Sequence, residues 1–296
     1  MSAAARPHDE QPGPPAVRRA AVLGSPIAHS LSPVLHRAAY RRLGLDGWSY
    51  GAFDVGEAAL PDFVAGLDPA AWAGLSLTMP LKRAVIPLLD SVGRAAHAVQ
   101  AVNTLVLRAD GSRHGENTDV PGLVAALAER GVASVPSATL LGGGATAAST
   151  LAALAEVTEG PVDVYVRSLE RSAQLRDLAE ALGLDARLVQ WDEAAVKALA
   201  APLVVNTTPI GAADGLAEAV PQDPGTLFDV LYHPWPTPLA AAWERAGGTV
   251  LGGLDLLIHQ AVLQVELMTG CGDAPRAGLV AAMREAGAGA LAARES

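Results

Sequence analysis

The chain has 296 residues, half of them hydrophobic, which is enough to form one large domain or two smaller ones with buried cores. Its formal net charge of −10 opposes non-specific binding to nucleic acid and to anionic membranes, because both attract basic surfaces. The single cysteine, Cys271, excludes an internal disulfide and any zinc site that needs two thiolates, and it fits a cytoplasmic protein.

The N-terminal segment, residues 1–17, combines four prolines with polar residues and lacks the apolar stretch of a signal peptide. We therefore expect it to be a disordered tail. No apolar run in the chain reaches the roughly 18 residues that a membrane helix requires, so no membrane contact is expected.

The first predicted strand is Ala20–Leu23, and a helix is predicted from Ser32 or Pro33, because proline suits the first helical turn. Further on, Leu75–Leu77 is predicted to be a short buried strand. Asn103–Leu107 predicts another, and the Asp-Gly pair at residues 110–111 is typical of a hairpin turn.

The middle of the chain alternates short apolar strands with helices, which indicates right-handed βαβ units and a parallel sheet. A last helix is expected where apolar residues recur at helical spacing near the C-terminus. The predicted strands are Ala138–Leu141, Val162–Val166 and Leu203–Asn206, and the predicted helices are Ala147–Glu156, Ser172–Leu182 and Leu254–Met268.

These elements predict an α/β protein of two domains. A nucleotide-binding domain of the Rossmann type is placed at residues 122–252, where strands and helices alternate. Residues 18–121 are predicted to form an N-terminal α/β substrate domain, on which the helices of residues 253–296 pack. Glycines in the connections at residues 119–122 and 252–254 are expected to serve as a hinge.

A glycine motif lies between a predicted strand and a predicted helix. Glycines allow close approach of the backbone to a pyrophosphate, and the helix N-terminus attracts that anion. The position of the motif favours dinucleotide binding over its alternative, a tight connection without a ligand. The motif has the form Gly-x-Gly-x-x-Ala and consists of Gly142, Gly143, Gly144, Ala145, Thr146 and Ala147.

The end of the next strand indicates which dinucleotide is bound. A site for NAD usually carries an acidic residue there, about 20 positions after the glycines, which bonds the 2′-hydroxyl of the ribose. This chain instead has Arg167 and Ser168, with Arg171 following. Two guanidiniums attract a 2′-phosphate that a carboxylate would repel. NADP is therefore predicted, with a solvated arginine pair as the alternative.

Residues 24–33 read Gly-Ser-Pro-Ile-Ala-His-Ser-Leu-Ser-Pro and place Ser30 and Ser32 at the mouth of the first predicted helix. Hydroxyls and helix N-terminal amides both suit a carboxylate. Taken alone, however, the pattern is better explained by a helix N-cap followed by a turn.

Further motifs follow in order: Thr-Met-Pro-Leu-Lys at 78–82, Ala-Val-Asn-Thr at 101–104, Glu-Asn-Thr-Asp at 116–119, Asn-Thr-Thr-Pro-Ile-Gly at 206–211 and Thr-Pro-Leu at 237–239. With the serine string and the glycine motif, this series resembles the shikimate dehydrogenase family over nearly the whole chain beyond the tail. The resemblance implies an enzyme of chorismate and aromatic amino acid biosynthesis that reduces 3-dehydroshikimate to shikimate with NADPH. We expect a monomer or homodimer that needs no metal.

The resemblance also implies roles for single residues. Lys82 and Asp119 match a catalytic pair, in which the ammonium polarises and protonates the carbonyl while the carboxylate holds it. The pair lies among the implied substrate contacts. The others are Ser30 and Ser32 at the substrate carboxylate, and Thr78, Asn103, Tyr232 and Gln260. The implied cofactor contacts are residues 142–147, Arg167, Ser168, Arg171, Val230 and Gly253.

Three positions depart from the family pattern. Ser76 replaces a common Asn, Val166 replaces the Asn before the clamp arginine, and Leu256 replaces a common Met beside the nicotinamide. None of them removes a charge, so the chemistry is expected to survive. His29 and His36 are expected to pack or cap, and Asp255 to face solvent or a helix N-terminus.

Three alternative functions are weighed against this one. A quinate/shikimate or aminoshikimate dehydrogenase of the same family is disfavoured by Ser32 and Arg167, because NAD-using quinate enzymes tend to alter both positions. A non-catalytic sensor of NADPH or shikimate would usually carry a further binding module. A folate-pathway dehydrogenase of similar architecture is disfavoured by the two serines.

Overall fold

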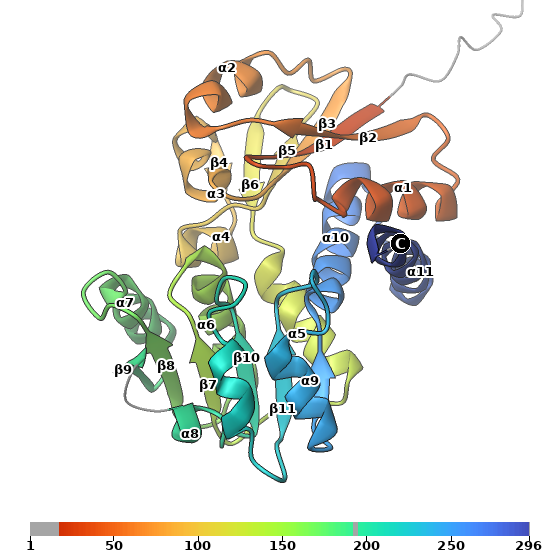
Figure 1. The fold of residues 1–296 in the computed structure, drawn as a ribbon. Coiled ribbons are helices and arrows are strands. Elements are labelled where there is room, and N and C mark those ends of the chain that lie inside the picture. The colour runs from red at the N-terminus through yellow and green to blue at the C-terminus, as the bar shows by residue number, and fades with distance from the viewer. Residues whose placement is uncertain (1–17, 192–194, 296) are drawn as a thin grey trace, which may run out of the picture.

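The computed structural model describes residues 18–191 and 195–295, so the tail predicted for residues 1–17 lies outside the described part of the chain. Two six-stranded sheets stand one above the other, with helices between and beside them (Figure 1). The predicted α/β class is therefore confirmed.

The elements have the following bounds. The strands are β1 (Arg18–Gly24), β2 (Trp48–Asp54), β3 (Trp72–Leu77), β4 (Ser91–Val92), β5 (Thr104–Leu107), β6 (Arg113–Glu116), β7 (Ala138–Leu141), β8 (Val162–Val166), β9 (Ala186–Gln190), β10 (Leu203–Asn206), β11 (Thr226–Asp229) and β12 (Thr249–Leu251). The α-helices are α1 (Ser32–Arg42), α2 (Leu60–Ala65), α3 (Leu81–Ala84), α4 (Arg94–Val99), α5 (Asp119–Glu129), α6 (Ala145–Val157), α7 (Ala173–Leu182), α8 (Ala195–Ala198), α9 (Pro238–Arg245), α10 (Gly253–Thr269) and α11 (Arg276–Glu295), and short 3₁₀ helices are η1 (Glu57–Ala59), η2 (Ile86–Leu88) and η4 (Asp214–Ala219).

The first sheet has the strand order β2-β1-β3-β5-β6-β4. Strand β1 pairs in parallel with β2 and β3, whereas β5 pairs antiparallel with both β3 and β6. The turn between β5 and β6 contains Gly111 with a φ of 83°, a conformation that glycine adopts without steric cost. The predicted hairpin turn is thus confirmed.

The second sheet is entirely parallel and has the order β12-β11-β10-β7-β8-β9. Numbered from β7 as strand 1, this is the 3-2-1-4-5-6 order of dinucleotide-binding folds. The strand order reverses between β7 and β10, so a ligand is expected outside the carboxyl ends of these two strands. The predicted Rossmann-like arrangement is confirmed.

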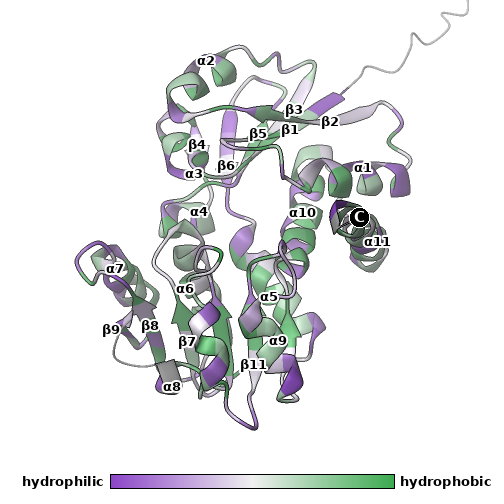
Figure 2. Ribbon diagram, in the orientation of Figure 1, coloured by the Kyte–Doolittle hydropathy of each residue, from purple (hydrophilic) through white to green (hydrophobic). Residues whose placement is uncertain are grey.

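Of the two C-terminal helices, α10 packs on the first sheet and α11 packs on α1 and α10. Helix α10 contacts α1, α5, β3 and β5, and α11 lies along α1. One buried cluster joins β1, α1, α10 and α11 through residues such as Leu35, Val265 and Met283. Another cluster joins β7 to α5 and α6, where Figure 2 shows mostly apolar ribbon. The limits assigned to the two domains stay a prediction.

The glycines expected to form a hinge lie at the starts of two helices. Residues 119–122 are the first turn of α5, and Gly253 begins α10. A Cβ on Gly122 would lie 2.9 Å from the backbone nitrogen of Gln260, and one on Gly253 would overlap the carbonyl of Val230. These glycines therefore permit close packing at the starts of α5 and α10, and their role as a hinge stays a prediction.

Candidate active site

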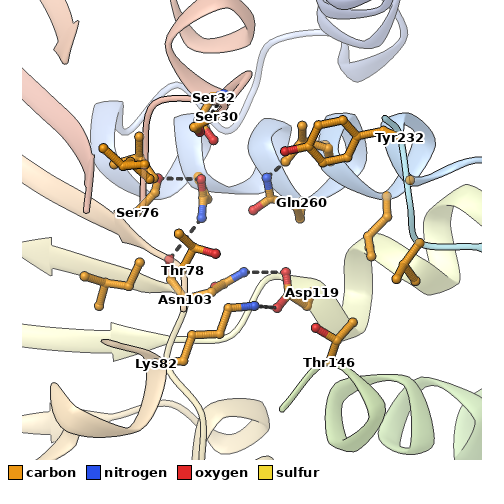
Figure 3. Close-up of a pocket in the computed structure, with 18 of the residues that line it drawn as sticks. Ser30, Ser32, Ser76, Thr78, Lys82, Asn103, Asp119, Thr146, Tyr232 and Gln260 are labelled. Atoms are coloured by element: carbon orange, nitrogen blue, oxygen red, sulfur yellow. Dashed lines mark hydrogen bonds and ion pairs between the residues drawn. The ribbon is translucent and has the colours of Figure 1, made fainter. Parts of the chain in front are cut away.

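A cavity of about 280 Å³ is lined by residues from both halves of the chain, which Figure 3 shows in close-up. The structure brings all eight predicted substrate contacts to its walls: Ser30, Ser32, Thr78, Lys82, Asn103, Asp119, Tyr232 and Gln260. Three of the predicted cofactor contacts, Thr146, Val230 and Gly253, line the same cavity. Substrate and cofactor residues predicted from separate motifs therefore meet at one place.

A lysine–carboxylate pair lies in this cavity. The Nζ of Lys82, in α3, is 2.6 Å from Oδ2 of Asp119, the first residue of α5. Asn103 donates from Nδ2 to the other carboxylate oxygen at 2.8 Å. The side chain of Asn117 accepts the backbone N–H groups of Asp119 and Val120, which caps α5. Both carboxylate oxygens are therefore held, and two ammonium hydrogens stay available for a ligand.

The other end of the cavity presents neutral hydroxyl groups. The Oγ of Ser30 accepts the backbone N–H of Ser32 at 3.2 Å, which leaves the hydroxyl hydrogen of Ser30 for a ligand. Burial raises the pKa of Tyr232, so its phenol stays protonated and can donate a hydrogen bond. Neutral donors of this kind suit a carboxylate.

Gln260 lies between these two ends. Its Nε2 donates to the carbonyl of Leu257 at 2.9 Å, and its Oε1 accepts from the hydroxyl of Thr118 at 3.3 Å. Leu256, one of the three departures, lies in the wall close by. The side chain of Gln260 is thus anchored at both polar atoms.

A second cavity, of about 370 Å³, lies at the carboxyl ends of β7 and β10. It is lined by six predicted cofactor contacts: Gly142, Gly143, Gly144, Arg167, Ser168 and Arg171. Ala145 and Ala147 line neither cavity, and Ala147 is fully buried inside α6. These two residues belong to the first turn of α6, directly after the glycine loop.

The geometry of this second cavity fits a phosphorylated dinucleotide. Gly142 has a φ of 120°, and a Cβ there would overlap Thr207, whereas a Cβ on Gly144 would meet nothing within 4 Å. The loop therefore offers open backbone in front of the N-terminus of α6. Neither Arg167 nor Arg171 forms an ion pair with another residue in the described ranges, so both are available to a phosphate.

Several residues that shape the two cavities had not been identified from the sequence. Asp229, at the end of β11, accepts the hydroxyl of Thr237 at 2.8 Å and the backbone N–H of Leu231 at 3.2 Å, which holds the segment leading to Tyr232. Burial raises the pKa of Asp229. Thr207 and Trp191 line the nucleotide cavity. A polar residue at the carboxyl end of a parallel strand signals a ligand site, and Asp229 is such a residue. The sequence analysis does not predict β11, so this signal could not be used.

His36 and Asp255 have structural roles, whereas the side chain of His29 has no packing or capping contact among the described residues. His36 is fully buried, stacks on Tyr50 at 3.9 Å and hydrogen-bonds Gln264 at 3.2 Å. His29 is exposed at the rim. Asp255 accepts the N–H of Gly252 at the start of α10, as expected for a carboxylate at a helix N-terminus. No group of three or more His, Cys, Asp or Glu within residues 18–191 and 195–295 is arranged to hold a metal ion.

The burial of His36 predicts a loss of stability in acid. Burial lowers its pKa to about 3, whereas the unfolded chain has an ordinary value near 6.5. As the pH falls from 6.5 towards 3, the unfolded state gains a proton that the folded state does not. The free energy of unfolding should then fall by up to about 1.4 kcal/mol per pH unit from this residue.

Urea unfolding at pH 6 and pH 5 measures this loss. His36→Gln should show a smaller difference between the two pH values than the wild type. His29→Gln, which changes an exposed histidine, should keep the wild-type difference. Equal differences in all three proteins would show that His36 does not cause the acid sensitivity.

Comparisons with known proteins agree with this arrangement. The family described as "Shikimate dehydrogenase substrate binding domain" matches residues 22–105. The chain is 38% identical over 257 residues to a shikimate dehydrogenase (NADP(+)) of Oleidesulfovibrio alaskensis, which covers 84% of this chain and 88% of that protein. A second relative with this name, from Methylobacterium radiotolerans, is 38% identical over 83% of this chain and 89% of its own length.

Solved structures show the same similarity. The shikimate dehydrogenase of Mycobacterium tuberculosis superposes with a TM-score of 0.82 at 41% identity, covering 90% of this chain and 99% of that one. The Thermus thermophilus enzyme, solved in complex with NADP(H) and shikimate, superposes with a TM-score of 0.77 at 36% identity, covering 91% and 99%. On this evidence, the chain belongs to the shikimate dehydrogenase family.

Proposed function

We propose that this protein catalyses the reversible, NADP-dependent reduction of 3-dehydroshikimate to shikimate. The observation that carries the proposal is the Lys82–Asp119 pair, at 2.6 Å, in a cavity whose wall also includes Val230 and Gly253. Relatives at 38% identity are shikimate dehydrogenases (NADP(+)), and the Thermus thermophilus enzyme binds both NADP(H) and shikimate.

The substrate is proposed to lie across the first cavity. Its carboxylate would accept hydrogen bonds from Ser30, Ser32 and Tyr232 at the hydroxyl end. The Lys82 ammonium then faces the ketone oxygen and stabilises the negative charge that develops there. As that oxygen gains charge, an N–H bond of Lys82 breaks and an O–H bond of shikimate forms. Asp119 holds the ammonium in place and favours its return to the charged form.

NADPH, when bound, supplies the hydride for this reduction. The nucleotide cavity would hold its pyrophosphate at the glycines 142–144 and its 2′-phosphate between Arg167 and Arg171. Val230 and Gly253 would border the nicotinamide. The close packing of Gly253 against Val230 keeps this part of the wall flat, because any side chain at position 253 would overlap the carbonyl of Val230.

We further propose that the protein is a monomer or homodimer in the cytoplasm that acts on a small-molecule substrate and does not bind nucleic acid. Within residues 18–191 and 195–295, no helix is both long enough and apolar enough to span a membrane.

Initial rates with four substrate–cofactor pairs test the proposed function. Shikimate with NADP should give the highest kcat/KM, ahead of quinate with NADP and of either substrate with NAD. The reason is that Arg167 and Arg171 favour the 2′-phosphate, whereas the serine end and Lys82 accommodate the shikimate ring. A higher kcat/KM with quinate, or with NAD, would support the quinate/shikimate alternative, and no turnover with any pair would support the sensor.

A further inference from the structure

A continuous series of buried hydrogen bonds runs from β2 to the candidate catalytic carboxylate. Its bonds are 2.6 Å, 2.6 Å, 3.0 Å, 2.8 Å and 2.8 Å long. Every member is at most 7% exposed. We call this series the donor chain, and it consists in order of Tyr50, Ser76, Gln264, Thr104, Asn103 and Asp119.

Two backbone groups determine the direction of the donor chain. The Nε2 of Gln264 faces the carbonyl of Asn103 at 3.2 Å, and a carbonyl can only accept. The Oδ1 of Asn103 faces the backbone N–H of Thr118 at 2.9 Å, which can only donate. Neither amide can therefore be reversed without the loss of a buried hydrogen bond.

The orientations of these two amides determine which group donates in every other hydrogen bond of the donor chain. The Oε1 of Gln264 must accept, so Ser76 donates to it, and Ser76 in turn accepts from Tyr50. Thr104 accepts from Nε2 of Gln264 and must then donate to Oδ1 of Asn103. Each donor thus points towards Asp119, and hydrogen bonds aligned in this way polarise and strengthen one another.

From this geometry we infer that Gln264 and Thr104 are positioning residues for the proposed reaction. They touch Asn103 rather than the reacting atoms. Together with the backbone N–H of Thr118, they hold its amide so that Nδ2 donates to Oδ1 of Asp119. The opposite oxygen, Oδ2, is then presented to Lys82. Ser76, at a position where the family commonly has Asn, is an intermediate member of the donor chain.

The inference rests on the proposed function and is tested by steady-state kinetics with shikimate and NADP. Thr104→Val nearly keeps the shape of the side chain but removes the hydroxyl that links Gln264 to Asn103. It should lower kcat about 10-fold, the effect of one to two lost hydrogen bonds, and raise the KM for shikimate less than about twofold. Thr104→Ser keeps the hydroxyl and should restore kcat to within about twofold of the wild type.

Val265→Ala is the matched control, because Val265 is a fully buried neighbour of Gln264 in α10 that lies in an apolar cluster. It should reduce thermal stability but leave kcat within about twofold. If Thr104→Val does not fold, Ser76→Ala decides, with an expected fall in kcat of about threefold.

The outcomes separate this inference from the proposed function. If the wild type is active and both Thr104→Val and Ser76→Ala keep its kcat, the positioning role is overturned but the proposed function is not. An equal loss of kcat in Thr104→Val and Val265→Ala also overturns it, because the effect would then come from the core in general. A folded wild type that does not oxidise shikimate overturns the proposed function instead.

Discussion

Replacement of Lys82 by alanine is expected to lower kcat by a factor of roughly 10²–10⁴, the range for loss of a positioned proton donor. The affinity for shikimate should change much less. Lys82 is placed for this role because its Nζ is 2.6 Å from Asp119, which is itself held by Asn103 at 2.8 Å. Without the ammonium, the developing alkoxide has neither a charge partner nor a proton source.

Kinetics of two further variants make this test specific. Arg83→Ala removes a charge from the adjacent, exposed position of α3 and should keep the wild-type kcat. Lys82→Arg keeps the charge, but arginine does not give up a proton readily, so it should also be slow. If Lys82→Ala keeps half of the wild-type kcat, Lys82 is not part of the mechanism.

The double change Arg167→Ala/Arg171→Ala is expected to raise the KM for NADP far more than the KM for NAD. A charge-assisted contact to a phosphate contributes about 1.5–3 kcal/mol, so each arginine should account for roughly a 10- to 150-fold change. The KM for NAD should change little, because NAD lacks the 2′-phosphate. Both arginines line the nucleotide cavity, and neither is paired with another described residue.

Arg176→Ala is the control for this double variant, because Arg176 is an exposed cation on α7 that does not line the cavity. It should leave both KM values near those of the wild type. An equal rise of the two KM values in the double variant would mean that Arg167 and Arg171 support the fold rather than the 2′-phosphate.

The sequence alone determined the central elements of the nucleotide-binding half. The predicted bounds of β7, β8 and β10 agree with the structure, and α6 starts two residues earlier than predicted. These strands are short apolar runs closed by glycine or polar residues, and such runs belong to strands buried on both faces. The glycine motif was also recognisable from the sequence, because it is identified by the strand directly before it and the helix directly after it.

Other elements depended on tertiary contacts. Strand β9 is a half-exposed edge strand and β12 is only three residues long, so pairing in the sheet rather than local pattern defines them. From the sequence, Gly122 is expected only to contribute to a hinge. Only the packing of α5 on α10 shows that it is needed for close approach to Gln260.

The candidate site shows the same division between what the sequence determines and what only the tertiary structure decides. Its residues could be named from motifs, each of which is local in sequence. The donor chain could not, because the bond from Tyr50 to Ser76 spans 26 positions and the bond from Ser76 to Gln264 spans 188. Its direction depends on the carbonyl of Asn103 and the amide of Thr118, whose positions follow from the ends of β5 and α5. Hydrogen-bond direction is a property of three-dimensional geometry, and a one-dimensional pattern does not contain it.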